Sequence, residues 1–280
     1  AKLNDIITKN PDHAAAHHYL IHVAESKRPE LAEASADALA PLMPNAGHLV
    51  HMPSHIFIRL GRYQDAYDTN VHAVAVDEDY IMQSKAQGIY PLMYYPHNVH
   101  FLSWSSMFTG RSGLAIEAAL KAKSILEMGV RKSSWGLGEN FRVQPIFVMV
   151  RFGKWQELLE MEKPFIKAQY LTGMWHYGRS MAYMNTGNMS AAKEELQKLQ
   201  EIVTKFEEGI PGYSEGGALT NVLNLEIASS LVSGQMASME GEFETAIYHL
   251  GTATRLEDSH VYTEPASWNF PTRHILGAIL

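Results

Sequence analysis

The chain has 280 residues, of which 46% are hydrophobic, and this supports either one large core or an extended stack of small helical units. Its formal net charge is -7 with histidine neutral, which disfavours nucleic acid as a partner. Cysteine is absent, so disulfides, thiolate metal sites and a cysteine nucleophile are excluded. No apolar run reaches the ~18 residues that a membrane span requires, so no span is expected.

The two ends of the sequence indicate that it is part of a longer protein. It begins with AKLNDIITKNPDH, without an initiator methionine or a signal-peptide pattern. It closes on LGAIL, an apolar run without a helix stop signal. We therefore expect an internal fragment of a longer chain.

Helical periodicity runs from about residue 14 to the end of the chain, and strand patterns are nearly absent. AAAHHYLIHVA (14–24) predicts the first helix of this series, and GHLVHMPSHIFIRL (47–60) predicts another. Residues 79–96 exceed what a regular repeat needs and are aromatic, so we expect an ordered insertion. A loop is predicted at 209–217 and a truncated helix at 271–280. The sequence predicts an all-α fold.

Glycines recur, at irregular intervals, between the two helices of successive pairs. A glycine can end a helix by adopting the left-handed conformation at little cost. The predicted turn glycines are Gly61, Gly110, Gly153, Gly187 and Gly241. Ala73, Ala122 and Ala253 each lie seven residues beyond another alanine of their unit, and we expect them where two helices cross closely.

A self-similar helix-turn-helix unit of about 34 residues is typical of a solenoid, and from about Ala14 onward the chain resembles the tetratricopeptide repeat family. The resemblance implies a single α-solenoid over 1–280, with about five to six repeats plus the truncated helix. Its histidine-rich half would span 14–128 and its second half 139–280. The segments GHLVHMPSHI, YYPHNVHF and Y-x-EP-x-x-W resemble those of a bacterial group of larger tetratricopeptide proteins. This resemblance does not indicate which reaction, if any, the protein catalyses.

Histidine is the most informative residue type, with 14 among 280 residues. In the predicted helix from Gly47, His48, His51 and His55 are spaced i, i+3 and i+7, and such residues share one helix face. Pro53 lies inside this helix and removes a backbone hydrogen bond to the carbonyl of Leu49. We expect a kink between His51 and His55 that turns both side chains toward a common centre.

The same register recurs in the neighbouring repeats. His97 and His100 occupy the second and fifth positions of the helix that begins at Pro96. His18 and His22 are the fifth and ninth residues of the first helix in the first repeat if its turn is one residue shorter than in the other repeats. If the turn is not shorter, His17 is the residue that faces the groove. The resemblance implies that these positions line the concave groove, where ligands bind.

Convergent imidazoles without cysteine suit a transition metal such as zinc, copper, iron or nickel. The predicted metal ligands are His18, His22, His48, His51, His55, His97 and His100. Seven exceed the need of one ion, so either two ions or one ion with additional supporting histidines fits. Glu25 and Arg59 are predicted to support these ligands or to contact substrate. Weaker candidates are Asn70, Asp77, Asp79, Tyr94 and Tyr95.

Several functions remain open at this stage. A metalloenzyme of hydrolytic or oxidative type, with a small-molecule or peptide ligand in the groove, is the leading hypothesis. The alternatives are a tetratricopeptide scaffold that binds a partner peptide or protein, and metal storage or delivery without catalysis. A pH-responsive groove of protonated imidazoles is a further alternative. No GxGxxG, Walker or GxSxG motif is present.

The remaining histidines are predicted to be structural or solvated. They are His13, His72, His249 and His260, together with His176 as a packing residue. His274 stays undecided because its helix is cut short.

Overall fold

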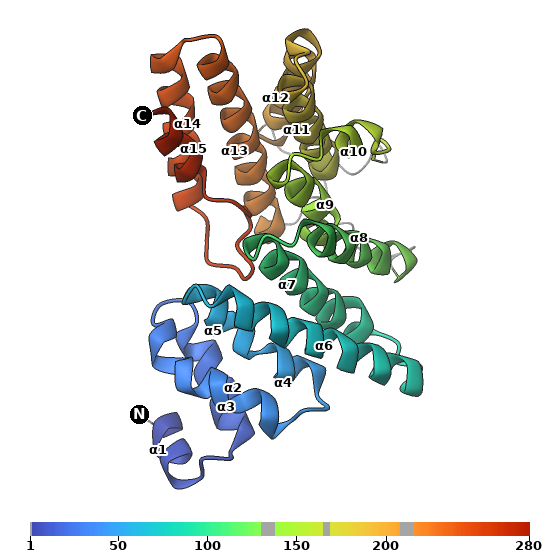
Figure 1. Cartoon of the computed structure of the whole chain (residues 1–280), viewed down its shortest axis with the longest axis vertical. Helices are drawn as coiled ribbons and strands as arrows, with labels where there is room; N and C mark the ends of the chain where they lie inside the picture. Colours follow the sequence, from blue (N-terminus) through green and yellow to red (C-terminus); the bar gives the residue numbers. More distant parts are fainter. Residues whose placement is uncertain (1, 130–137, 165–168, 208–214) are drawn as a thin grey trace. The chain divides into compact units, whose positions relative to one another are not determined.

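A computed structural model describes residues 2–129, 138–164, 169–207 and 215–280. Every regular element in these ranges is helical, which confirms the predicted all-α fold. No described helix has the length and apolar character needed to cross a membrane. The chain divides into two compact units, residues 1–131 and 132–280, coloured blue to green and green to red in Figure 1.

The first unit carries all the predicted metal ligands. Its elements are α1 (Lys2–Lys9), α2 (Ala14–Ala24), the 3-10 helix η1 (Pro29–Ala32), α3 (Glu33–Leu42), α4 (Gly47–His51), α5 (Pro53–Arg59), α6 (Tyr63–Ser84), the π-helix η2 (Tyr90–Tyr94), α7 (Tyr95–Phe108) and α8 (Ser112–Gly129). Helix α6 packs against α4, α5 and α7, and α7 packs in turn against α8 (Figure 1). The fully buried Ile21, Ile56 and Phe101 contribute to its core.

The second unit is built from longer helices. They are α9 (Glu139–Arg151), α10 (Trp155–Glu160), α11 (Gln169–Asn185), α12 (Met189–Glu207), α13 (Glu215–Met239), α14 (Phe243–Asp258) and α15 (Thr272–Ile279). Helix α15 confirms that a helix forms near the end of the chain. Helix α11 packs against α9, α10, α12 and α13. A side-chain carbon on Gly173 would lie 2.4 Å from Cδ2 of Leu225, so glycine permits the close approach of α11 and α13.

The turns between paired helices form as predicted. At Gly187, between α11 and α12, φ is 84°, a left-handed conformation that glycine adopts without steric cost. The four other predicted turn glycines, Gly61, Gly110, Gly153 and Gly241, also have positive φ. Ala73, Ala122 and Ala253 are fully buried, which agrees with close helix crossings at these positions.

The insertion expected at 79–96 is largely helical. Helix α6 continues to Ser84 and ends at Lys85, whose φ is 49°. The π-helix η2 follows directly before α7. The hydroxyl of Tyr90 donates to the carboxylate of Asp77 (2.7 Å), which ties the insertion to α6. The loop predicted at 209–217 falls mainly outside the described residues.

The helix predicted over 47–60 is divided into α4 and α5 at Met52, the residue before Pro53, where the backbone stays in the right-handed helical region (φ -50°, ψ -37°). The backbone N–H of His55 donates to the carbonyl of Met52 (3.2 Å), which tightens the chain at this point. The hydroxyl of Ser54 donates to the carbonyl of His51 (2.7 Å). Local side-chain bonding therefore stabilises the break.

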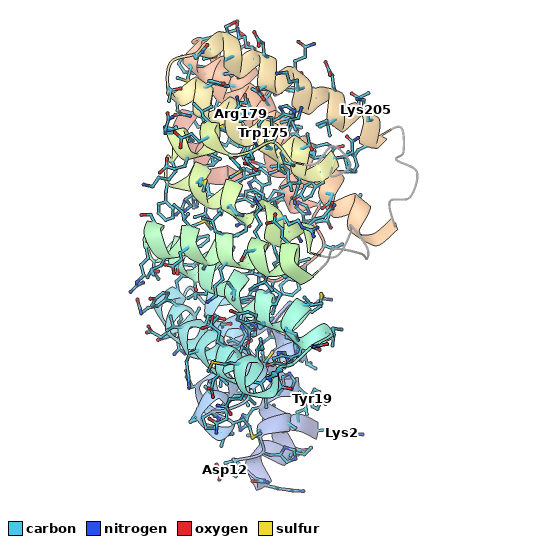
Figure 2. The ribbon with its side chains drawn as sticks, turned by 90° about the vertical axis from the view of Figure 1, so that its right-hand side faces the viewer. Lys2, Asp12, Tyr19, Trp175, Arg179 and Lys205 are labelled. Carbon is cyan, nitrogen blue, oxygen red and sulfur yellow. The ribbon has the colours of Figure 1, made fainter. Side chains whose placement is uncertain are left out.

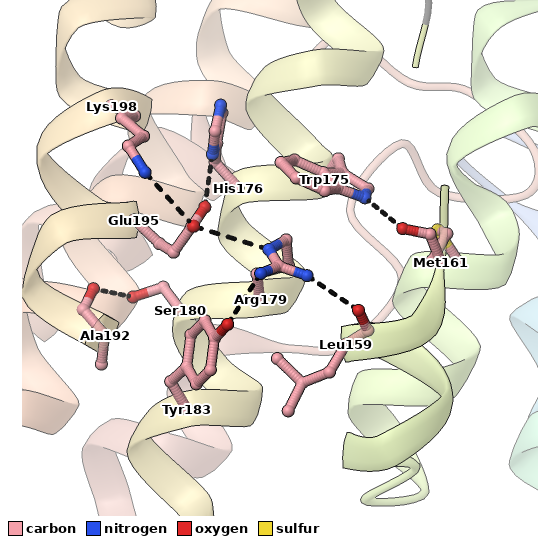
Figure 3. A network of polar contacts seen from close by, with 10 residues as sticks. All are labelled: Leu159, Met161, Trp175, His176, Arg179, Ser180, Tyr183, Ala192, Glu195 and Lys198. Carbon is pink, nitrogen blue, oxygen red and sulfur yellow. Dashed lines mark hydrogen bonds and ion pairs between the residues drawn. The ribbon is translucent and has the colours of Figure 1, made fainter. Parts of the chain in front are cut away.

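A buried polar network connects α11 to α12 in the second unit (Figure 3). The carboxylate of Glu195 lies 2.5 Å from Nδ1 of His176 and 3.5 Å from Nε of Arg179. Arg179 also donates to the carbonyl of Leu159 (2.8 Å), and Trp175 donates to that of Met161 (3.0 Å). His176 is buried in this network, in keeping with the packing role predicted for it.

Candidate metal centre

Six of the seven histidines predicted as ligands lie close together in the first unit, in two groups of three. The inner group is His51, His55 and His97, and the outer group is His18, His22 and His48. Within each group, one potential ligand atom of every residue lies within 4.8 Å of the other two. Among the described residues, the six do not form one combined group at this spacing.

Four helices bring the groups together. Helix α2 supplies His18 and His22, one turn apart, and α4 supplies His48 and His51. The break at Met52 separates His51 from His55 on α5, while α7 supplies His97. The two groups differ in burial: His51 and His55 are buried, whereas His22 is exposed and His18 and His48 are half-buried.

The hydrogen bonds of His51 determine which ring nitrogen can bind a metal. The side-chain N–H of Asn70 donates to the carbonyl of Ala66 (2.7 Å), so the amide oxygen of Asn70 faces Nδ1 of His51 (2.7 Å). The Ser54 oxygen lies 3.2 Å from the same Nδ1. Both oxygens act as acceptors, because the Ser54 hydroxyl hydrogen is used by a backbone carbonyl. His51 therefore carries its proton on Nδ1 and presents a lone pair at Nε2.

His55 is oriented in the same way by a carboxylate. Nδ1 of His55 lies 3.1 Å from Oε2 of Glu25, a contact that favours a proton on this nitrogen. Nε2 of His55 lies 3.0 Å from Nε2 of His51. Two lone pairs at this distance repel each other unless a cation lies between them. Imidazole nitrogens bound to one tetrahedral zinc ion lie about 3.3 Å apart, since each Zn–N bond is about 2.0–2.1 Å.

The inner imidazoles lie in apolar surroundings. The ring of His97 lies 4.8 Å from that of His51 and 4.9 Å from that of Phe101, measured between centroids. Burial, followed by repulsion from neighbouring histidines, lowers the pKa of both His51 and His97 well below the usual value. The neutral imidazole, which is the form that binds metal, is thus favoured.

The outer group contains buried nitrogens without hydrogen-bond partners. They are Nε2 of His18 and Nδ1 of His48, considered within the part of the chain that the structure describes. Burial and neighbouring histidines lower the pKa of His48 to about 4 and also lower that of His18. Leaving a buried polar atom unpaired costs about 1–3 kcal/mol, so a ligand at these atoms would recover stability.

Aromatic rings border the outer group. The Tyr94 ring meets that of His48 edge-on, with 5.0 Å between centroids. The Tyr19 ring stacks on His18 at 5.3 Å and projects from α2 at the surface (Figure 2). Tyr19 is 57% exposed and Tyr94 40% exposed, so both remain accessible beside the histidines.

Glu25 is the acidic residue predicted to support the ligands, and it contacts two of them. Its carboxylate lies 3.4 Å from Nδ1 of His22 and 3.1 Å from Nδ1 of His55. Burial alone would raise the pKa of Glu25, but the hydrogen bonds to the two histidines outweigh it and bring the pKa to about 2. The carboxylate is therefore ionised over the whole physiological range.

Two further predicted residues stand outside the groups. His100 is buried but belongs to neither three-histidine group within the described residues. Arg59 is exposed and donates to the carbonyl of Ser26 (3.3 Å). His17, the alternative groove residue, contacts Ser35 Oγ (2.9 Å) and the Pro11 carbonyl (2.8 Å), so both of its nitrogens have structural partners.

The weaker candidates divide into one supporting residue and several structural ones. Asn70 orients His51, whereas Asp77 accepts hydrogen bonds from Tyr90 and Asn98. Tyr95 donates to Glu78 (2.7 Å), away from the imidazoles. Asp79 bonds to an exposed glutamine one turn away.

Ser54 was not among the predicted site residues, and His13 was predicted only to be structural or solvated. Ser54 follows His51 by one helical turn, and its spacing could have marked it as a supporting residue. His13 accepts the backbone N–H of Ala16 (3.2 Å) and caps α2. The exposed His72 on α6 is consistent with its predicted solvated position.

The arrangement provides two sets of three imidazoles, of which the inner set is more buried than the outer set. Three protein ligands leave one position of a tetrahedral ion open for water or substrate. In comparisons with protein-family models, curated proteins and solved structures, no match to this chain was found.

Proposed function

We propose that this chain is a tetratricopeptide-like α-solenoid that binds a transition metal through imidazoles in its concave groove. Helix pairs joined by left-handed glycines, with fully buried alanines at the predicted crossings, support the repeat architecture. The convergence of α2, α4, α5 and α7 on the two histidine groups supports the placement of the ligands in one groove.

The observation that carries the metal-binding proposal is the 3.0 Å separation between Nε2 of His51 and Nε2 of His55. Nδ1 of His51 faces the amide oxygen of Asn70, and Nδ1 of His55 lies 3.1 Å from the carboxylate of Glu25, so protons on these two nitrogens would leave a lone pair on each Nε2. Either a proton on His55 or a metal ion can occupy this contact. A proton would explain neither the third imidazole, His97, nor the adjacent outer group, whereas metal binding at both groups accounts for both.

The open coordination position favours catalysis over storage. Structural zinc sites are closed by four protein ligands, whereas catalytic sites keep a position for water or substrate. Zinc here would lower the pKa of a bound water and support hydrolysis. Copper or iron, which imidazoles also bind, would support oxidative chemistry. A small-molecule or peptide substrate at the outer group would meet the exposed rings of Tyr19 and Tyr94.

Elemental analysis of protein purified without an affinity tag tests metal binding. We expect at least one equivalent of zinc, copper or iron in the parent and a marked loss in the His51→Ala/His97→Ala variant. His72→Ala is the matched control, since His72 lies exposed on α6 in the same unit. Substoichiometric metal in the parent, or equal metal in the parent and the double variant, would contradict the proposal.

The identity of the metal in the parent protein determines which activity should be assayed. A zinc protein should hydrolyse activated esters or peptides, and a copper or iron protein should consume O2 with a reducing substrate. Activity should disappear with chelator and return with the same metal. Tight binding of a peptide that is indifferent to chelator would instead support the scaffold alternative.

A further inference from the structure

One carboxylate contacts a histidine from each group. Glu25 follows directly after α2, and its Oε1 lies 3.4 Å from Nδ1 of His22 on the same helix. Its other oxygen, Oε2, lies 3.1 Å from Nδ1 of His55 on α5. His22 belongs to the outer group and His55 to the inner group. The two oxygens of Glu25 thus engage the two groups separately.

We propose that the outer and inner groups are two metal centres of one binuclear site, and that Glu25 is the positioning residue that both centres share. This inference rests on the metal-binding function proposed above and adds to it the number of ions and the residue that links them. Glu25 acts through His22 and His55 and does not itself bind the ions.

The spacing of the imidazoles favours two ions over one. An ion with all six imidazoles would need every ligand nitrogen within about 4.2 Å of the others, twice an octahedral bond of about 2.1 Å. The described histidines form two separate groups instead. The ring centroids of His22 and His55 are 5.9 Å apart, and those of His48 and His51 are 6.4 Å apart, so the groups are neighbours.

The contacts at Nδ1 determine what Glu25 does for each ligand. A carboxylate that accepts the Nδ1 proton fixes the ring orientation, leaves Nε2 as the ligand atom and makes it more basic. The carboxylate of Glu25 lies within ion-pair distance of Nδ1 on one ring of each group and would act on both rings in this way. Losing such a partner lowers metal affinity by about 10–100-fold, and here the loss should reach both centres.

Charge provides a second reason for a shared carboxylate. Imidazoles bind metal ions in their neutral form and contribute no charge to the site. Within the described residues, the ion-pair partners of Glu25 are the two histidines. Its negative charge lies beside both groups and would reduce the repulsion between two dications.

Titration with Co2+ tests the proposal, because the visible absorption of Co2+ reports both occupancy and coordination geometry. The metal-stripped parent should bind two equivalents. His22→Ala should lose the outer equivalent only, and His97→Ala the inner one only. Glu25→Gln should keep both equivalents but lower the affinity of each by about 10–100-fold.

Two controls separate positioning from folding. Glu33→Gln removes a half-exposed carboxylate of the same unit that pairs with Arg62, and it should leave both affinities unchanged. Glu25→Asp keeps the charge and should recover part of the affinity that Glu25→Gln loses. Thermal unfolding with chelator gives the stability of each metal-free variant, and if Glu25→Gln does not fold, Glu25→Asp carries the test with a smaller loss at both centres.

The outcomes distinguish this inference from the function on which it rests. One equivalent in the parent, or a Glu25 variant that weakens one centre and leaves the other unchanged, overturns the shared role while metal binding stands. Co2+ that fails to bind the folded parent overturns both.

Discussion

The carboxylate of Asp77 on α6 occupies the space where Gly47 would carry a side chain at the first residue of α4. A carbon added at Gly47 would lie 1.9 Å from Oδ1 of Asp77 and 2.6 Å from its Cγ. Asp77 is fully buried and held by Tyr90 Oη–H and Asn98 Nδ2–H, each donating at 2.7 Å. The contact between α4 and α6, which sets the position of His48 and His51, therefore depends on glycine.

Gly47→Ala should destabilise the protein by about 2–4 kcal/mol, because displacing Asp77 breaks two hydrogen bonds to a buried charge, each worth about 1.5–3 kcal/mol. Urea unfolding of the variant measures the loss. Gly277→Ala on α15 is the control, since a side-chain carbon there meets no atom within 4 Å. Equal stability of the parent and the Gly47 variant would show that Asp77 can move without cost.

Metal removal should lower stability if the histidine groups bind ions as proposed. A ligand present at 100 times its dissociation constant stabilises the folded state by about 2.7 kcal/mol per site. Thermal unfolding with and without chelator should show this difference in the parent and in His72→Ala, and a smaller one in His51→Ala/His97→Ala. Unfolding curves of the parent that coincide with and without chelator would contradict the prediction.

The metal-free protein should lose stability as the pH falls from about 6.5 to about 4. Unfolded imidazoles bind protons near pH 6.5, whereas burial, followed by repulsion from neighbouring histidines, lowers the pKa of His48 to about 4. The pKa values of His18, His51 and His97 are lowered by the same two causes. The unfolded chain therefore binds more protons in this window, and the free energy of unfolding decreases with falling pH.

Urea unfolding in chelator at a series of pH values measures this slope, and His48→Gln should flatten it by removing one contributor. Glu25 acts in a lower window, because its pKa is lowered from 4.5 to about 2 and its contribution is lost as the pH falls through that range. If the free energy of unfolding increased as the pH falls from 6.5 to 4, the assignment of neutral histidines would be contradicted.

The sequence predicted the all-α fold class and the proximity of most of the candidate histidines because both follow from local periodicity. Spacings of i+3, i+4 and i+7 place histidines on one face of a helix independently of how that helix packs against other segments. The left-handed turn glycines, such as Gly187, are likewise determined locally. Pro53 predicted the break because it lacks the N–H that a continuous helix needs.

The remaining features depend on contacts between distant segments. His100 shares a helix face with His97 by spacing, yet the packing of α7 leaves it outside both three-histidine groups of the described residues. The contact of Glu25 with His55 requires α5 to pack against α2, which no pattern in either helix specifies. Asp77 was a weaker candidate for a supporting residue, but the insertion at 79–96 supplies Tyr90 as its partner.

The polar network of the second unit should be structural and independent of metal. Glu195→Gln removes the charge that pairs with His176 and Arg179, and breaking a buried pair costs about 3–5 kcal/mol. Lys198→Ala, which removes the half-exposed partner, should cost at most about 1 kcal/mol. Urea unfolding compares the two variants, and metal content should match the parent in both. A loss of metal in the folded Glu195 variant would contradict independence.

Pro53→Ala tests whether the break at Met52 orients the inner histidines. Alanine restores an N–H that can donate to the carbonyl of Leu49, so α4 and α5 can join into one continuous helix. That change would rotate His55 relative to His51 and widen the 3.0 Å separation of their Nε2 atoms. Metal affinity should fall by at least about 10-fold, as expected when ligand orientation is lost. Stability in chelator should change by less than about 1 kcal/mol, because the new hydrogen bond offsets the lost packing. Pro41→Ala in α3 supplies a matched helical proline outside the site, and it should leave Co2+ affinity unchanged. Parent-like Co2+ affinity and spectrum in Pro53→Ala would show that the histidines reach the ion without the break.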